Sequence, residues 1–191
     1  MEGEKDMLTH CGTQIIYTER LTLRRFIYED WEAMQKNWVS DPKVQRMYGE
    51  PVYETKEEIT GLLGKYIEAY EKQDVYRWAI ILKESNECIG QIAFFMVNSQ
   101  NHFAEIEYCI GGQFQKRGLA TEATLAIIDY GFKKINLHKV QISHREENLA
   151  SEGVIKKCGF RYEGTLRDFF FIDGHYKDRL YYSILKHEKR M

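Results

Sequence analysis

Six consecutive residues, Gln115-Lys116-Arg117-Gly118-Leu119-Ala120, form the segment of this sequence best suited to binding an anion. Gly118 has no side chain, so the backbone can approach a ligand closely at that position. The segment opens a predicted helix, and the free N–H groups and dipole of a helix N-terminus favour a pyrophosphate. Lys116 and Arg117 add positive charge. On these six residues alone, an ordinary turn at a helix start is an equal alternative, because neither the P-loop nor the dinucleotide-binding glycine pattern is present.

Two carboxylates precede this segment and could accept a proton. Glu105 and Glu107 lie two positions apart in the predicted strand 103–110, so they share one face of it. The other face carries Ala104, Ile106 and Tyr108 and is predicted to pack in the core. Glu105 is the first candidate for a general base and Glu107 the second, and the alternative for both is a surface carboxylate.

The elements that position these residues follow from apolar spacing and turn signals. We predict a mixed α/β fold with about seven strands and four helices. The middle of the chain reads strand, helix, strand, which predicts two parallel strands joined by a right-handed crossover. The predicted strands are 20–26, 76–82, 88–97, 103–110, 139–143, 160–172 and 175–185, and the predicted helices are 29–39, 55–70, 119–134 and 148–158.

Length and composition set limits on the class of protein. The 191 residues, 43% of them hydrophobic, suit one domain, predicted over residues 15–188 after an irregular segment 1–14. A net charge of -2 predicts no nucleic-acid or anionic-membrane partner. The four cysteines include no metal-ligand spacing, so no metal site is expected. The absence of a secretory leader or an apolar span predicts a cytoplasmic protein.

Several motifs in a consistent order identify a family resemblance. Residues 115–120 match the Q/R-x-x-G-x-G/A signature of the GNAT acetyltransferase superfamily, between a predicted strand and a predicted helix. Residues 147–151 (E-N-L-A-S) and 157–160 (K-C-G-F) are similar to the family's E-N-x-x-S and K-x-G-F elements. The order of these motifs is more specific than any one of them.

The two ends of the chain resemble one branch of that superfamily. Residues 20–24 (R-L-T-L-R) and the C-terminal segments 163–168 and 172–178 resemble the RimJ/RimL-like branch, which is ribosomal-protein-alanine acetyltransferase-like. The resemblance runs over about residues 18–185. It implies a single GNAT-like domain whose central sheet is mostly antiparallel, with one splayed parallel strand pair.

The resemblance also implies how acetyl-CoA would bind as a co-substrate. The strand 103–110 is expected to carry a bulge and to splay from strand 139–143, so that the pantetheine arm lies between them like an added strand. A backbone N–H near Cys109 or Ile110 would polarise the thioester carbonyl. The implied contacts with acetyl-CoA are Tyr108, Cys109, Ile110, Gln115, Lys116, Arg117, Gly118, Leu119, Ala120, Thr121, Asn148 and Ser151.

The implied reaction is acetyl transfer to a primary amine. An amine attacks only when neutral, and general-base help contributes roughly 10²–10⁴-fold, which is the expected role of Glu105 or Glu107. Ser151 occupies the position of the acid that protonates the leaving thiolate, although water could suffice. Nothing near Cys109 marks an activating base, so we predict direct transfer without an acyl-enzyme.

The acceptor stays open between a protein N-terminal amine and a small-molecule amine. The family's C-terminal hairpin can carry a glutamate base, but this chain has Phe169-Phe170-Phe171 there, which could line the acceptor site, form a dimer contact or pack in the core. The chain is predicted to be a monomer or a homodimer. The alternatives are a CoA-binding regulatory module without transferase activity and a nucleotide-binding α/β domain of another class.

Overall fold

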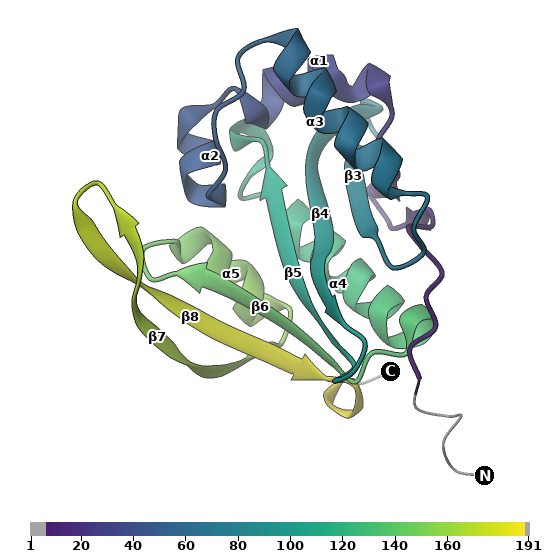
Figure 1. Cartoon of the computed structure of the whole chain (residues 1–191), viewed down its shortest axis with the longest axis vertical. Helices are drawn as coiled ribbons and strands as arrows, with labels where there is room; N and C mark the ends of the chain where they lie inside the picture. Colours follow the sequence, from purple (N-terminus) through teal and green to yellow (C-terminus); the bar gives the residue numbers. More distant parts are fainter. Residues whose placement is uncertain (1–6, 190–191) are drawn as a thin grey trace.

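The computed structural model of the chain describes residues 7–189, and this part contains one mixed eight-stranded sheet and five α-helices (Figure 1). The strands lie in the order β1-β2-β3-β4-β5-β6-β8-β7, and β5 and β6 form a parallel pair within an otherwise antiparallel sheet. The strands are β1 (Ile16–Tyr17), β2 (Leu21–Arg24), β3 (Tyr76–Leu82), β4 (Glu87–Asn98), β5 (Phe103–Ile110), β6 (Lys139–Arg145), β7 (Arg161–Ile172) and β8 (His175–Leu185).

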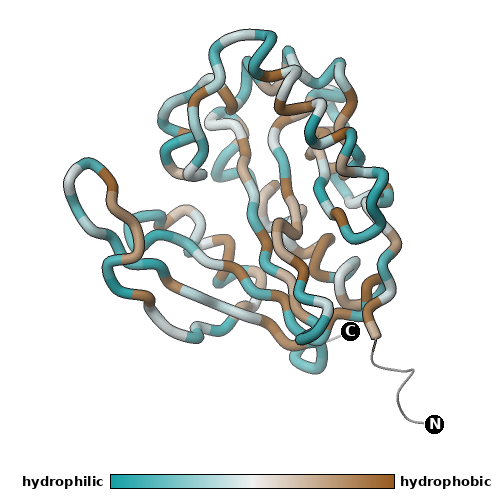
Figure 2. Tube along the Cα trace, viewed as in Figure 1, coloured by the Kyte–Doolittle hydropathy of each residue, from teal (hydrophilic) through white to brown (hydrophobic). Residues whose placement is uncertain are grey.

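Helices cover both faces of the sheet (Figure 1). One hydrophobic cluster packs α1 to α3 on one face, around Trp38 and Leu63, and a second packs α4 and α5 on the other, around Ile127 and Ile155. Figure 2 shows that hydrophobic residues gather along the central strands and the helices packed on them. The helices are α1 (Trp31–Met34), α2 (Pro42–Tyr48), α3 (Lys56–Ala69), α4 (Leu119–Tyr130) and α5 (Leu149–Lys157); π-helical turns extend α1 over Gln35–Val39 and α4 over Gly131–Ile135.

The prediction of about seven strands and four helices was one strand and one helix short. The missed strand, β1, is only two residues long and pairs with Thr22 and Leu23. The missed helix, α2, begins at Pro42, which sequence reasoning took only as the end of the preceding helix. Proline is tolerated at the first helical position because its missing N–H has no partner there. Asp41 caps the helix by accepting hydrogen bonds from the backbone of Lys43 and Val44.

The predicted irregular segment 1–14 lies in part outside the described residues. Its described part, residues 7–14, has no helix or strand but is held by backbone hydrogen bonds from Thr9 to Ile135 and from Gly12 to Gln73. Thr13 is buried there. No helix within residues 7–189 is long and apolar enough to cross a lipid bilayer.

The parallel strands β5 and β6 separate part of the way along their length (Figure 1). They pair from Phe103 and Lys139 as far as Ile106 and Ile142, after which β6 continues only beside β8. The expected bulge exists, but it lies in the neighbouring strand β4 and not in β5, where the family resemblance placed it. Phe95 is the extra residue, opposite the β5 residues at which the separation begins. A bulge bends its strand and increases the local twist, which favours this divergence.

Candidate active site

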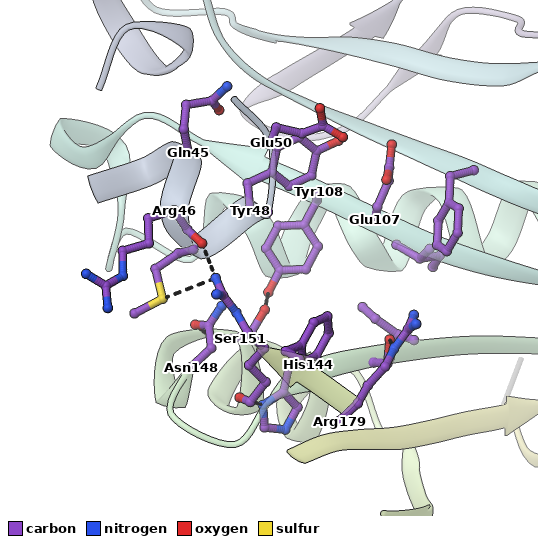
Figure 3. A pocket seen from close by; sticks show the side chains of 18 of the residues that line it. Gln45, Arg46, Tyr48, Glu50, Glu107, Tyr108, His144, Asn148, Ser151 and Arg179 are labelled. Carbon is purple, nitrogen blue, oxygen red and sulfur yellow. Dashed lines mark hydrogen bonds between the residues drawn. The ribbon is translucent and has the colours of Figure 1, made fainter. Parts of the chain in front are cut away.

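A cavity of about 490 Å³ lies at the opening between β5 and β6 (Figure 3). Its walls are the end of α2 with the residues that follow it, both diverging strands, the start of α5 and the β7–β8 hairpin. The predicted residues Glu107, Tyr108, Asn148 and Ser151 line it, so the fold brings together side chains from β5 and α5 that are about 40 residues apart. Glu105 is not among the lining residues.

The turn before α4 has the backbone geometry of an anion site. Lys116 has φ 61° and Gly118 has φ 79°, a left-handed conformation that favours glycine. Within the described chain no side chain caps the first turn of α4, so its N–H groups stay available to a ligand. Leu119 is buried and anchors the helix, while Ala120 and Thr121 are half-buried. The residues implied for pyrophosphate binding therefore meet in one place.

An ion pair between Arg20, which immediately precedes β2, and Glu122 of α4 fixes this turn. The Arg20 guanidinium donates to the Arg117 carbonyl at 2.9 Å and pairs with Glu122 at 2.7 Å. Burial raises the pKa of Glu122, but hydrogen bonds from Thr18 and Arg20 outweigh it and lower that pKa overall. The Arg20 side chain thus holds the main chain of the turn, and the Arg117 side chain is left half-exposed beside Glu84.

The backbone of β5 presents alternate residues to the opening. The Cys109 carbonyl faces β4, because a Cβ added to Gly90 would lie 2.2 Å from it. The Ile110 carbonyl points the other way and accepts a hydrogen bond from the Gln115 side chain at 3.0 Å. Since successive residues of a strand direct their backbone groups to opposite sides, Tyr108 and Ile110 face the opening. Cys109 and Ile110 were the two residues whose N–H could polarise the thioester carbonyl. Of these, only the N–H of Ile110 points toward the opening between β5 and β6.

A hydroxyl pair stands where β5 meets α5. The hydroxyl groups of Tyr108 and Ser151 are 2.8 Å apart, as the dashed line in Figure 3 marks. Asn148 caps α5 by accepting a hydrogen bond from the Ser151 backbone at 3.1 Å. Burial raises the pKa of Tyr108, so this phenol stays protonated and keeps a proton to donate.

Glu105 is a buried carboxylate held by three side chains. Arg179 donates to it at 2.7 Å, Ser143 at 3.0 Å and Gln141 at 2.9 Å. Its side chain is only 4% exposed. The first candidate for the general base therefore ties β5, β6 and β8 together just behind the cavity, and does not face it.

Glu107 faces the cavity together with a second carboxylate, Glu50, which sequence reasoning missed (Figure 3). Arg77 pairs with Glu107 at 2.6 Å. Glu50 forms no ion pair within the described residues. Burial, followed by the negative charge of Glu107, raises the pKa of Glu50. Glu50 follows α2, and with α2 unpredicted the only sequence signal was its position just before Pro51.

Cys109 and the three phenylalanines 169–171 were the other residues for which the sequence suggested a role. Cys109 is 4% exposed, and burial raises the pKa of its thiol, which disfavours the nucleophilic thiolate. Phe170 lines the cavity, whereas Phe169 and Phe171 are 48% and 66% exposed, so core packing does not account for those two. Arg145 was also missed, although a charged residue two positions after the predicted strand 139–143 was a usable signal.

Comparison with known proteins shows that most of the chain is similar to acetyltransferases. Residues 20–161 match the model of the acetyltransferase (GNAT) domain. The chain is 33% identical to the uncharacterised N-acetyltransferase p20 of Bacillus licheniformis, over 92% of this chain and 98% of that protein. It is 30% identical to the spermidine N(1)-acetyltransferase of Escherichia coli K12, over 78% and 77% of the two chains. Vibrio cholerae spermidine N-acetyltransferase, solved with CoA and spermine, superposes with a TM-score of 0.77 at 26% identity, over 90% of this chain and 98% of that one.

Proposed function

The chain belongs to the GNAT family of acetyltransferases, and from that premise we propose that it transfers an acetyl group from acetyl-CoA to a primary amine by direct attack on the thioester. Acetyl-CoA is the co-substrate, as in the family's solved complexes with CoA or acetyl-CoA. The observation that carries the proposal is the separation of β5 from β6 after Ile106 and Ile142, beside a cavity and an uncapped helix N-terminus.

The residues present fit acetyl-CoA in two places. The N–H groups of residues 116–121 and the α4 dipole suit the pyrophosphate, and Lys116 and Arg117 add charge near it. The backbone of Tyr108 and Ile110 and the amide of Asn148 suit the pantetheine arm. Bound there, acetyl-CoA supplies the thioester carbonyl, whose oxygen gains negative charge that the Ile110 N–H would stabilise.

We assign the general base to the carboxylates that face the cavity. The amine nitrogen bonds to the carbonyl carbon, the carbon–sulfur bond breaks, and the amine proton passes to Glu50 or Glu107, directly or through water. Glu50 suits this role because its raised pKa lies nearer to the working pH and no cation pairs with it. Glu105 becomes a positioning residue, because Arg179 and Ser143 already donate to its Oε1 and Gln141 donates to its Oε2.

The Tyr108–Ser151 pair would stabilise the leaving sulfur. Ser151 can donate a hydrogen bond to the thiolate while Tyr108 donates to Ser151, which strengthens the Ser151 donor. Water then supplies the proton, since a CoA thiolate is a good leaving group. The raised pKa of the Cys109 thiol supports transfer without an acyl-enzyme.

The finer assignments rest on the sequence motifs. We place the chain in the RimJ/RimL-like branch, with either a protein N-terminal amine or a small-molecule amine as acceptor, and as a monomer or homodimer. The four cysteines are free, which supports a cytoplasmic location. A CoA-binding regulatory module is the competing proposal, and the carboxylates of Glu50 and Glu107, which face the cavity, argue against it.

Thiol release from acetyl-CoA across a panel of primary amines tests the proposal. Gly118→Glu should abolish CoA binding in calorimetry and thiol release, because it adds charge and a side chain at a left-handed position in the anion site. Gly159→Glu is the matched control, with φ 84° and open space around it. CoA binding without thiol release from any amine would favour the regulatory module, and CoA binding that Gly118→Glu leaves intact would refute the donor site.

A further inference from the structure

Most charged side chains around the cavity are already paired. Arg179 pairs with Glu105 and Arg77 pairs with Glu107. Two further side chains of the lining, Glu50 and Arg145, have no oppositely charged partner within 4.0 Å among the described residues. The cavity therefore contains one carboxylate and one guanidinium group that take part in no ion pair among the described residues.

Arg145 is the more informative of the two because it is 6% exposed. Its Nη2 donates to the Arg46 carbonyl at the end of α2 and lies 3.9 Å from the Met47 sulfur, and its guanidinium is 5.8 Å from the Phe170 ring. Its Nε and Nη1 have no hydrogen-bond acceptor within residues 7–189. A buried guanidinium without an anion is costly, and capping the end of α2 uses only one of its three nitrogens.

A second cation stands next to Arg145. The Arg46 side chain also lines the cavity. Burial is the main cause of a lowered pKa of Arg145; the charge of Glu147 opposes this shift, and the positive charge of Arg46 adds to it. Arg46 pairs with Asp173 in the turn of the β7–β8 hairpin, but both of those side chains are more than half exposed, so solvent screens the pair. An anionic group beside Arg145 would relieve the repulsion between the two guanidinium groups.

The unpaired charges on the two sides of the cavity are of opposite sign. Figure 3 shows Arg46 on one side of the Tyr108–Ser151 pair and Glu107 on the other, with Glu50 nearer to Glu107. The side that would receive the amine carries the carboxylates of Glu50 and Glu107 and the guanidinium of Arg179, whose charge is paired with Glu105. The opposite side carries Arg46, whose carbonyl accepts a hydrogen bond from Arg145. No residue of the turn 115–120 lines the cavity, so the phosphates of acetyl-CoA would not occupy this cationic side.

We propose that the acceptor carries an oxyanion, a carboxylate or a phosphate, in addition to its amine, and that Arg145 binds this oxyanion. The proposal rests on the proposed function and sharpens it: the acceptor class becomes an amino acid, a peptide end or an amino phosphate, and linear polyamines are disfavoured. Two anchored ends would hold the amine over the thioester in one orientation, which is the positional advantage that an enzyme gains from remote binding groups.

A matched set of propylamines tests the class. 1-Aminopropane, 4-aminobutanoate, 3-aminopropylphosphonate and 1,3-diaminopropane all carry the amine on a chain of three methylene or methyl carbons and differ only in the group attached to the far carbon, which is hydrogen, carboxylate, phosphonate or a second amine. We expect kcat/KM to be about 30-fold higher for one of the two anionic amines than for 1-aminopropane, as a desolvated charge pair provides. The comparison of the carboxylate with the phosphonate identifies which oxyanion is used. Equal rates for all four amines, or the highest rate with the diamine, would overturn the proposal.

Variants of Arg145 connect the preference to this side chain. Arg145→Gln should abolish the advantage of the anionic amine, so that the ratio of its kcat/KM to that of 1-aminopropane falls to about one, and Arg145→Lys should restore part of that advantage. Arg167→Gln is the control, because it removes an equal charge from an exposed position of β7. An Arg145→Gln variant that slows all four amines equally would show a structural role and refute anion binding.

A binding measurement separates this proposal from the proposed function. Calorimetry of the CoA-saturated chain should show heat for 4-aminobutanoate or 3-aminopropylphosphonate, and Arg145→Gln should remove it. If no amine releases thiol but this heat is present and depends on Arg145, the oxyanion site stands and the transferase proposal fails. If thiol is released but the CoA-saturated chain binds neither anionic amine, the oxyanion site fails and the transferase proposal stands.

Discussion

The Tyr108–Ser151 pair could stabilise the leaving sulfur or donate its proton, and the size of the loss in kcat on mutation distinguishes these two roles. If the pair only stabilises the leaving sulfur, Tyr108→Phe removes one neutral hydrogen bond of 2.8 Å. Such a bond contributes about 0.5–1.5 kcal/mol, which corresponds to a roughly two- to twelve-fold loss in kcat. If the pair were the only source of the proton, the loss would be about 10²–10⁴-fold. The two ranges do not overlap.

The pH dependence gives an independent reading of the same variant. Burial raises the pKa of Tyr108 above its ordinary value of 10.0. The folded protein therefore keeps the Tyr108 proton through neutral and mildly alkaline pH, and its loss cannot limit the rate below about pH 10. We expect the alkaline side of the kcat profile to be the same for the wild type and Tyr108→Phe.

Steady-state thiol release, with kcat and KM determined for acetyl-CoA, measures both effects. Ser151→Ala and the double variant complete a cycle, and we expect the double variant to lose no more than about the larger single loss, because both changes remove one chain of hydrogen bonds. Tyr162→Phe is the matched control, since it removes a hydroxyl that contacts Thr165 on exposed β7. A 10³-fold loss in Tyr108→Phe, or a loss confined to the KM for acetyl-CoA, would refute this account of the pair.

Three further changes test the carboxylates and the sheet. Glu107→Gln removes a charge that raises the pKa of Glu50, so the acid limb of kcat/KM should move to lower pH, and an unmoved limb would exclude Glu50 as the base. Glu105→Gln leaves Arg179 without its buried carboxylate. Urea denaturation should show a fall in the free energy of unfolding near the low end of about 3–5 kcal/mol, because Arg179 is partly exposed. An unchanged urea midpoint would contradict the positioning role of Glu105. Gly90→Ala places a Cβ 2.2 Å from a β5 carbonyl, so it should prevent folding or lower the melting temperature sharply in calorimetry, and a stable variant would show that β4 and β5 can move apart.

The local structure of the proposed donor side could be predicted from nearby sequence. The turn 115–120 and Asn148 each lie within a few residues of the helix that they begin, so short-range rules on glycine, helix N-termini and capping apply to them directly. The strand 103–110 was predicted with its observed bounds because alternating side chains mark a half-buried strand. The family resemblance is confirmed by the match over residues 20–161.

The acceptor side could not be predicted because it depends on packing between distant segments. Glu50 reaches the cavity only because α2 folds against β5, and Pro42 gave a misleading signal for that helix. The partners of Glu105 come from β6 and β8, up to 74 positions away in the chain. The bulge at Phe95 depends on the register between two strands, which a single sequence does not encode locally.

The donor side and the acceptor side of the site also differ in the kind of protein group that would bind each substrate. In the proposed arrangement, acetyl-CoA meets mainly backbone groups, whose positions depend on the sheet and on the start of α4, so many sequences can provide the same donor site. The proposed acceptor site consists of side chains from the end of α2, the end of β6 and the β7–β8 hairpin, and each of these can change without disturbing the turn 115–120. One family can therefore keep its donor and change its acceptor, and likeness to a spermidine acetyltransferase does not determine the acceptor of this chain. The charges around Arg145 and Glu50 carry that information.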